Sequence, residues 1–138
     1  MKKAHIATFS VMLALFIAGL TGLNLQAART PGVMLTRIDP AIVDDVLQSY
    51  PVTVQARIQF VNHSGSPVDI YWINFEGHRV LFEKNLAVNA SWTAGTFLTH
   101  PWLIVVSGSG GTTESDTGLR IGGFVALTTN GDTANITN

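Results

Sequence analysis

The stretch Val52-Thr53-Val54-Gln55-Ala56-Arg57-Ile58-Gln59-Phe60 decides the fold class of this chain. Apolar residues occupy every second position from Val52 to Phe60, and polar residues fill the positions between them. A period of two is typical of a β-strand that buries one face and exposes the other. The sequence therefore predicts a half-buried strand over residues 52–60.

The segments that follow also have the composition of strands. They are rich in β-branched and aromatic residues, and turn residues separate them. Further strands are predicted at residues 68–73, 79–83, 92–97, 102–106, 124–127 and 134–137. The continuous apolar run at 102–106 is typical of a strand buried on both faces. Short strands at close spacing predict an all-β domain, either a sandwich or a barrel.

The residues between the strands predict how the strands are connected. His63-Ser64-Gly65-Ser66-Pro67 predicts a turn that joins the strands at 52–60 and 68–73 in a hairpin. Asn130-Gly131 is a pair favoured in tight hairpin turns, and it predicts a hairpin between the last two strands. The polar, glycine-rich residues 107–118 predict a long mobile loop.

The residues before the strands contain the one predicted helix. Residues 28–38 show little periodicity and predict a lead-in segment over the surface. Asp39-Pro40 predicts a helix start, with an N-cap followed by proline in the first turn. The helix is expected to end near Ser49, because Pro51 disfavours helical dihedral angles at the residue before it. Its apolar residues are Ile42, Val43, Val46 and Leu47. We expect this helix to pack against the domain or to serve as a spacer.

The N-terminus has the features of a secretory signal peptide. Lys2 and Lys3 give a positive start, residues 7–23 carry no charge, and Ala27 lies at a cleavage point. An uncleaved membrane anchor is the alternative, because the apolar run approaches the roughly 17 to 20 residues that a spanning helix needs. We predict an exported protein, periplasmic or extracellular, that contacts a membrane only if this segment stays uncleaved.

Composition limits the rest of the chain to one domain. Removal of residues 1–27 from the 138-residue chain leaves 111 residues, which we divide into a lead-in with a short helix (28–51) and a β domain (52–138). Six Lys and Arg remain against nine Asp and Glu, so the formal charge of −3 argues against nucleic acid as a partner. The absence of cysteine excludes disulfides and thiolate chemistry.

The polar residues form no pattern typical of a catalytic or metal site. His63, His78 and His100 lack the paired spacing of metal ligands. No serine lies in a nucleophile-elbow motif. The glycines of residues 107–118 lack the following lysine and helix of a phosphate-binding loop. The sequence predicts a protein that is not an enzyme and binds no metal or cofactor.

Large aromatic residues are frequent, and they fill either the core or a shallow pocket. Four stretches that contain several of them are residues 60–64 (FVNHS), 71–77 (YWINFEG), 96–102 (TFLTHPW) and 134–137 (ANIT). In order and spacing these stretches resemble the β domain of the von Hippel-Lindau tumour suppressor. The resemblance covers about residues 54–138, and its most specific part is the Trp-apolar-Asn-Phe-acid-Gly segment that begins at Trp72.

The resemblance implies a small β-sandwich with a peptide site. That family's β domain holds an extended peptide whose hydroxyproline lies in an aromatic pocket, where a serine and a histidine bind the hydroxyl. Matching residues place Trp72 and Trp102 in the pocket wall, His100 at the histidine and Thr96 at the serine. Thr96 still supplies a hydroxyl.

Three positions and the end of the chain depart from the family. Phe82 and Phe97 match two tyrosines and lack their hydroxyls, and Gly95 replaces a histidine. The tumour suppressor continues into a helical domain that docks onto a ubiquitin ligase, whereas this chain ends at Asn138, just after the last predicted strand. We therefore expect no ubiquitin-ligase adaptor as a partner.

Three functions follow from this reading. We expect a binding module for an extended proline- or hydroxyproline-containing peptide or protein segment, in which Trp102 and His100 are partly exposed and close together. A structural or assembly domain without a retained pocket is the alternative, and it predicts that residues 28–50 or another segment cover these rings. An enzyme would need a convergent polar cluster, which the sequence lacks.

Overall fold

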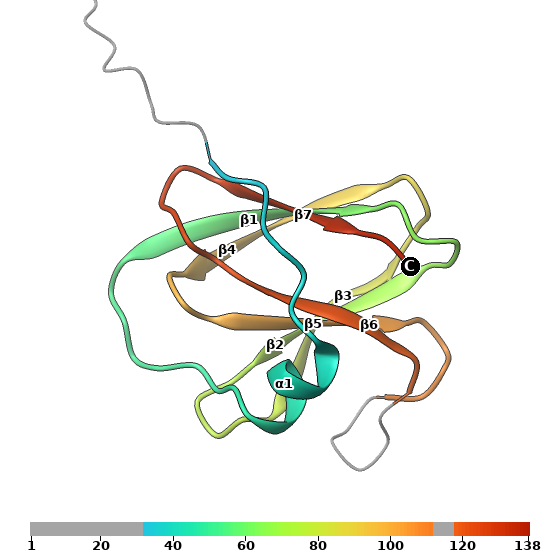
Figure 1. Ribbon diagram of the computed structural model, residues 1–138, viewed down its shortest axis with the longest axis horizontal. Helices are drawn as coiled ribbons and strands as arrows, with labels where there is room; N and C mark the ends of the chain where they lie inside the picture. The colour runs from blue at the N-terminus through green and yellow to red at the C-terminus, as the bar shows by residue number, and fades with distance from the viewer. Residues whose placement is uncertain (1–31, 112–117) are drawn as a thin grey trace, which may run out of the picture.

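Two β-sheets lie face to face in the computed structural model, which describes residues 32–111 and 118–138 (Figure 1). One sheet has the strand order β4-β1-β7 and the other β3-β2-β5-β6. The elements are α1 (Pro40–Asp45), β1 (Gln55–Asn62), β2 (Val68–Ile73), β3 (Arg79–Leu86), β4 (Ser91–Phe97), β5 (Pro101–Val106), β6 (Arg120–Val125) and β7 (Asp132–Ile136). The prediction of an all-β, sandwich-like domain with one short helix is confirmed. The predicted signal peptide lies outside the described residues.

Strand β1 has the alternation that the sequence predicts. Ala56, Ile58 and Phe60 are buried, and the polar residues between them are exposed. The strand begins at Gln55 instead of Val52, where pairing with β4 starts. It lies at the centre of its sheet, antiparallel to β4 and parallel to β7.

The predicted hairpin between β1 and β2 is wrong, because the two strands belong to different sheets. Both edges of β1 are already occupied by β4 and β7, so β2 has no edge to pair with. The residues between them form a corner, which the buried Asn62 side chain organises. Its Nδ2 donates to the carbonyls of Ser66 and Leu86 at 2.9 Å, and its Oδ1 accepts from the N–H and hydroxyl of Ser64.

The predicted hairpin at Asn130-Gly131 is also wrong. Strand β6 belongs to the four-stranded sheet, whereas β7 lies in the other sheet, parallel to β1. Gly131 does have the expected positive φ, of 93°. However, the buried carboxylate of Asp132 accepts the N–H groups of Leu127 and Thr128 at 2.7 and 2.8 Å, and this arrangement turns the chain across to the other sheet.

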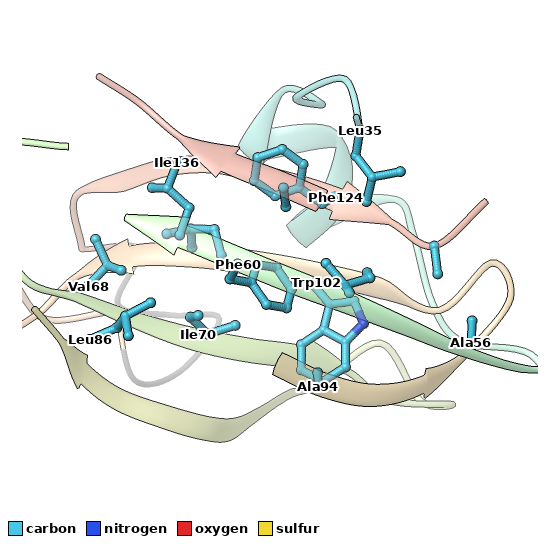
Figure 2. Packing of buried hydrophobic residues seen from close by; sticks show 14 residues of the cluster. Leu35, Ala56, Phe60, Val68, Ile70, Leu86, Ala94, Trp102, Phe124 and Ile136 are labelled. Carbon is cyan, nitrogen blue, oxygen red and sulfur yellow. The ribbon is translucent and has the colours of Figure 1, made fainter. Parts of the chain in front are cut away.

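The core lies between the sheets and is built around aromatic rings (Figure 2). The ring of Phe60 on β1 lies 5.6 Å from that of Trp102 on β5 and 6.3 Å from that of Phe124 on β6, measured between centroids. A second buried cluster covers the opposite face of β5, where Leu103 and Val105 pack together. Strand β5 is therefore buried on both faces, as the sequence predicts.

Helix α1 packs over this second cluster and contributes Val43 to it. Its start is as predicted, with the Asp39 carboxylate accepting the N–H of Ala41 at 2.8 Å. It packs on the sheet through Val43, which lies so close to Gly123 of β6 that a Cβ there would come within 2.2 Å of it. The helix ends at Asp45 instead of near Ser49, because the Ser49 N–H donates to the Asn74 carbonyl, 2.9 Å away, and so holds the chain in another direction.

An ion cluster fastens α1 to the sheet. The Asp44 carboxylate accepts from Nε of Arg79 at 2.7 Å and from a second nitrogen of the same guanidinium. Arg120 of β6 also donates to it, at 2.7 Å. The side chains of Asp44 and Arg79 are 1% and 0% exposed. The charges are therefore shielded from water and satisfied by one another.

The lead-in segment crosses one open side of the sandwich (Figure 1). Leu35 donates its N–H to Thr133 of β7 at 2.7 Å, and Ile38 exchanges backbone hydrogen bonds with Gly123 of β6. The segment differs from the expected surface course in one respect, because the Leu35 side chain joins the core. The chain thus pairs with the outer edges of β6 and β7. On the other side, β3 and β4 are the edge strands of the described sheets.

Candidate functional site

An aromatic pocket of about 220 Å³ lies beside the edge strands β3 and β4. All six residues that the sequence predicts for a binding site contribute to it, although they come from β2, β3, β4, β5 and the turn before β5. Phe75 and Gly95 complete the lining. The full set is Trp72, Phe75, Phe82, Gly95, Thr96, Phe97, His100 and Trp102.

The rings of the pocket pack against one another at close range. Trp72 stacks on His100 with centroids 5.5 Å apart and an interplanar angle of 25°. Phe82 meets Trp102 edge to face at 5.3 Å, and Phe75 meets His100 in the same way at 5.7 Å. Edge-to-face and stacked pairs at these separations are favourable, so the walls hold one another in place.

Exposure divides the pocket into a rim and a floor. Phe75 and Phe82 are 46% and 49% exposed and lie at the rim. Trp102 and His100 are only 1% and 4% exposed, so the expectation that both are partly exposed is wrong. The reason is that Trp102 also packs on Phe60 in the core, so one indole forms the floor of the pocket and part of the core.

Two polar side chains face this aromatic lining. Thr96 Oγ1 accepts a hydrogen bond from Nε1 of Trp102 at 3.2 Å, which leaves its own proton available for donation. Nε2 of His100 lies 3.1 Å from the carbonyl oxygen of Tyr50. Because a carbonyl only accepts, Nε2 carries the proton, and Nδ1 of the neutral ring is an acceptor.

The chain between α1 and β1 supports the pocket from behind. Ser49 Oγ accepts from Nε1 of Trp72 at 2.7 Å and donates to the Ile73 carbonyl at 2.5 Å. With the contact between Tyr50 and His100, this orients two pocket rings. Residues 49–50 thus contact two of the pocket rings through hydrogen bonds, while the rim remains exposed.

A strained turn places His100 in the pocket. Thr99 has a φ of 68°, a region that β-branched residues rarely adopt. Its N–H donates to the carbonyl of Ala126 at 3.1 Å, and the His100 N–H donates to that of Phe97 at 3.3 Å. Strain of this kind persists only where surrounding contacts enforce it, and it is common at binding sites.

Sequence reasoning missed four contributors to this site. Gly95 was noted only as the replacement of a family histidine, although it lines the pocket. Phe75 had a detectable signal, since it lies three residues after Trp72 in the most specific part of the resemblance. Ser49 and Tyr50 had none, because their hydrogen bonds to Trp72 and His100 span 23 and 50 residues of sequence.

Two other features are absent from residues 32–111 and 118–138. No group of three or more metal-ligating side chains comes together there. No helix among them is long and apolar enough to cross a bilayer.

Comparison with known proteins gives no independent assignment. No protein-family model matches the chain, and no curated protein is significantly similar to it. The resemblance to the von Hippel-Lindau β domain therefore rests on the motifs quoted above.

Proposed function

We propose that this protein is a non-catalytic binding module that holds a proline-like ring of an extended peptide in the aromatic pocket. The observation that carries the proposal is the convergence of six residues from distant segments on one small apolar hollow. Beside the indole N–H groups, its polar side-chain groups are the Thr96 hydroxyl and the His100 ring. That set suits recognition better than catalysis.

The size of the pocket supports a single ring as its occupant. Sites for whole small molecules commonly enclose about 300–1,000 Å³, whereas this pocket encloses about 220 Å³. A proline ring is compact and apolar, and it can lie against aromatic faces with little loss of conformational entropy, because its φ is already fixed.

The two polar groups favour a hydroxylated ring. A ligand hydroxyl can accept a hydrogen bond from Thr96 and donate one to Nδ1 of His100, because each protein group offers the complementary role. An unmodified ring would leave both groups without a ligand partner in a largely apolar site, which costs free energy. We therefore expect hydroxyproline to bind more tightly than proline.

The edge of β4 supports an extended ligand. It pairs with β1 on one side only, and an extended peptide can add to such an edge through main-chain hydrogen bonds. The lead-in pairs in this way with the opposite side of the sandwich. Because Phe82 and Phe97 lack the hydroxyls of the family's tyrosines, ring burial and main-chain pairing would supply most of the affinity.

Export is part of the same proposal. The charged start, apolar run and Ala27 of the N-terminal segment support secretion to the periplasm or outside the cell. Fractionation of the source cells tests this, with N-terminal sequencing of the exported protein. A mature N-terminus at residue 28 is expected, whereas full-length protein in the membrane fraction would indicate an uncleaved anchor.

The binding test is a titration followed by tryptophan fluorescence, since Trp72 and Trp102 line the pocket. The purified protein is titrated with two peptides that differ only in proline or hydroxyproline. Thr96→Val removes the hydroxyl with little change in shape, and Thr96→Ser is the matched control that keeps it. We expect saturable binding, with a preference for hydroxyproline of about fivefold to tenfold that Thr96→Val abolishes and Thr96→Ser retains.

A structural or assembly role is the second candidate. The burial of Trp102 against Phe60 and the hydrogen bond between His100 and the Tyr50 carbonyl favour it. In that case, neither peptide would change the fluorescence of a correctly folded protein. Such a result would contradict the binding proposal and would leave the sandwich as a scaffold.

A further inference from the structure

A second hollow adjoins the aromatic pocket and is more polar. It encloses about 670 Å³ and shares Gly95, Thr96 and Phe97 with the aromatic pocket. Its other lining residues are Gln55, Ala56, Arg57, Thr129 and Asn130. A peptide that places a ring in the pocket therefore passes next to this hollow.

Arg57 lies on the exposed face of β1, directly opposite Gly95 in the antiparallel pairing with β4. Residues paired in this way share one face of a sheet. Gly95 has no positive φ, and a Cβ added to it would meet nothing within 4 Å. A glycine weakens a strand relative to alanine, and neither backbone strain nor crowding among the described residues explains why Gly95 is a glycine. A glycine in a strand often marks the close approach of a ligand.

Among the described residues, no acidic side chain pairs with the charge of Arg57. No carboxylate lines this hollow, and Arg57 forms no ion pair within residues 32–111 and 118–138. The amides of Gln55 and Asn130 add hydrogen-bond donors beside it. A guanidinium flanked by amide donors is suited to a carboxylate, which it can bind through two parallel hydrogen bonds.

We propose that Arg57, together with Gln55 and Asn130, binds the side-chain carboxylate of an Asp or Glu in the same peptide that fills the aromatic pocket. This inference rests on the proposed function and specifies the ligand further. Thr96 faces the buried side of β4 and Gly95 the exposed side. Because successive side chains of an extended peptide alternate in direction, the acidic residue is adjacent to the ring residue.

The test uses terminally blocked peptides with one hydroxyproline. An Asp is placed one or two positions from the ring on either side, and each peptide has a partner with Asn in that place. At low salt we expect an adjacent Asp to tighten binding about fivefold over Asn, and an Asp two positions away to have no such effect. The gain should fall as salt is raised, since part of Arg57 is exposed to solvent.

Two variants make the test specific to Arg57. Arg57→Gln should abolish the difference between Asp and Asn peptides while leaving the Asn peptide bound. Lys84→Gln removes the same charge from an exposed position on β3 outside both hollows, so it should keep the difference. Equal binding of adjacent-Asp and Asn peptides, or a gain that survives in Arg57→Gln, would overturn the subsite and leave the proposed function in place. Absence of binding by every peptide would overturn both.

Discussion

The buried ion cluster of Asp44 provides the most direct test of how this fold is held together. Its carboxylate accepts hydrogen bonds from Arg79 and Arg120, which joins α1 to β3 and β6. Asp44→Asn keeps the shape of the side chain but removes its charge. Two guanidinium groups would then face a neutral amide, and the one on Arg79 is fully buried.

The expected loss of stability is large. Removing one partner of a buried ion pair costs about 3–5 kcal/mol, because the remaining charge is desolvated without compensation. With a urea dependence of about 2 kcal/mol/M for a small domain, the unfolding midpoint should fall by about 2 M. Tryptophan fluorescence during urea unfolding measures this shift. Asp45→Asn is the matched control, because this neighbour is 66% exposed and lies 3.9 Å from Arg120, so its loss should cost less than about 0.5 kcal/mol.

The pH dependence gives the same prediction a second readout. Burial raises the pKa of Asp44, but the hydrogen bonds and charges of Arg79 and Arg120 outweigh it and hold the pKa below its ordinary value of 3.8. A carboxyl with a lowered pKa stabilises the fold above its unfolded-state pKa, and that contribution disappears as the pH falls through the folded value. Asp44→Asn should therefore lose less stability below pH 4 than the unaltered protein. Equal midpoints for Asp44→Asn and Asp45→Asn would refute the reasoning.

Three further substitutions test individual contacts by urea unfolding. Asp132→Asn should lower the free energy of unfolding by about 3 kcal/mol, because an amide nitrogen would face the backbone N–H groups that now donate to the carboxylate. A decrease of less than about 1 kcal/mol would contradict this role. Ser49→Ala should cost about 1–3 kcal/mol and change the fluorescence of Trp72, whose Nε1 loses its acceptor, whereas an unchanged spectrum would argue against the contact. Thr99→Gly should stabilise the protein by about 0.5–1 kcal/mol, since glycine adopts positive φ without strain, and Thr99→Ala should bring no such gain.

The strands were predictable because their signals are local. The alternation in β1 and the apolar run of β5 each identify a strand and its buried faces without reference to the rest of the chain. The connections were not predictable in this way. Whether a turn makes a hairpin or a corner depends on which strand edges are free, and β1 has both edges occupied by strands that follow much later in the sequence.

The buried polar residues that decide these corners carry no local signature. Asn62 and Asp132 lie in turn-like sequences, and either could equally occupy an exposed hairpin turn. Their roles become visible only when their partners are known, such as Leu86 for Asn62 and Val33 for Asp132. The two wrong hairpin predictions share this cause.

The sequence was sufficient to predict most of the residues that line the pocket, but not how exposed their side chains are. The resemblance placed Trp72, Thr96, His100 and Trp102 together, and the structure brings them around one pocket. Whether a pocket ring is exposed depends on what packs behind it. Phe60 lies behind Trp102, and the carbonyl of Tyr50 caps Nε2 of His100. Motif spacing contains no information on either contact.

The stability of the fold and the geometry of the site share one physical support. A six-residue helix does not persist alone in water, so α1 depends on its attachment through Asp44 and Val43. The chain that leaves this helix carries Ser49 and Tyr50, whose hydrogen bonds orient the rings of Trp72 and His100. The Tyr50 carbonyl favours the tautomer of His100 with the proton on Nε2, which leaves Nδ1 as the acceptor. The polar groups offered to a ligand therefore depend in part on a helix that packs against the opposite face of the four-stranded sheet.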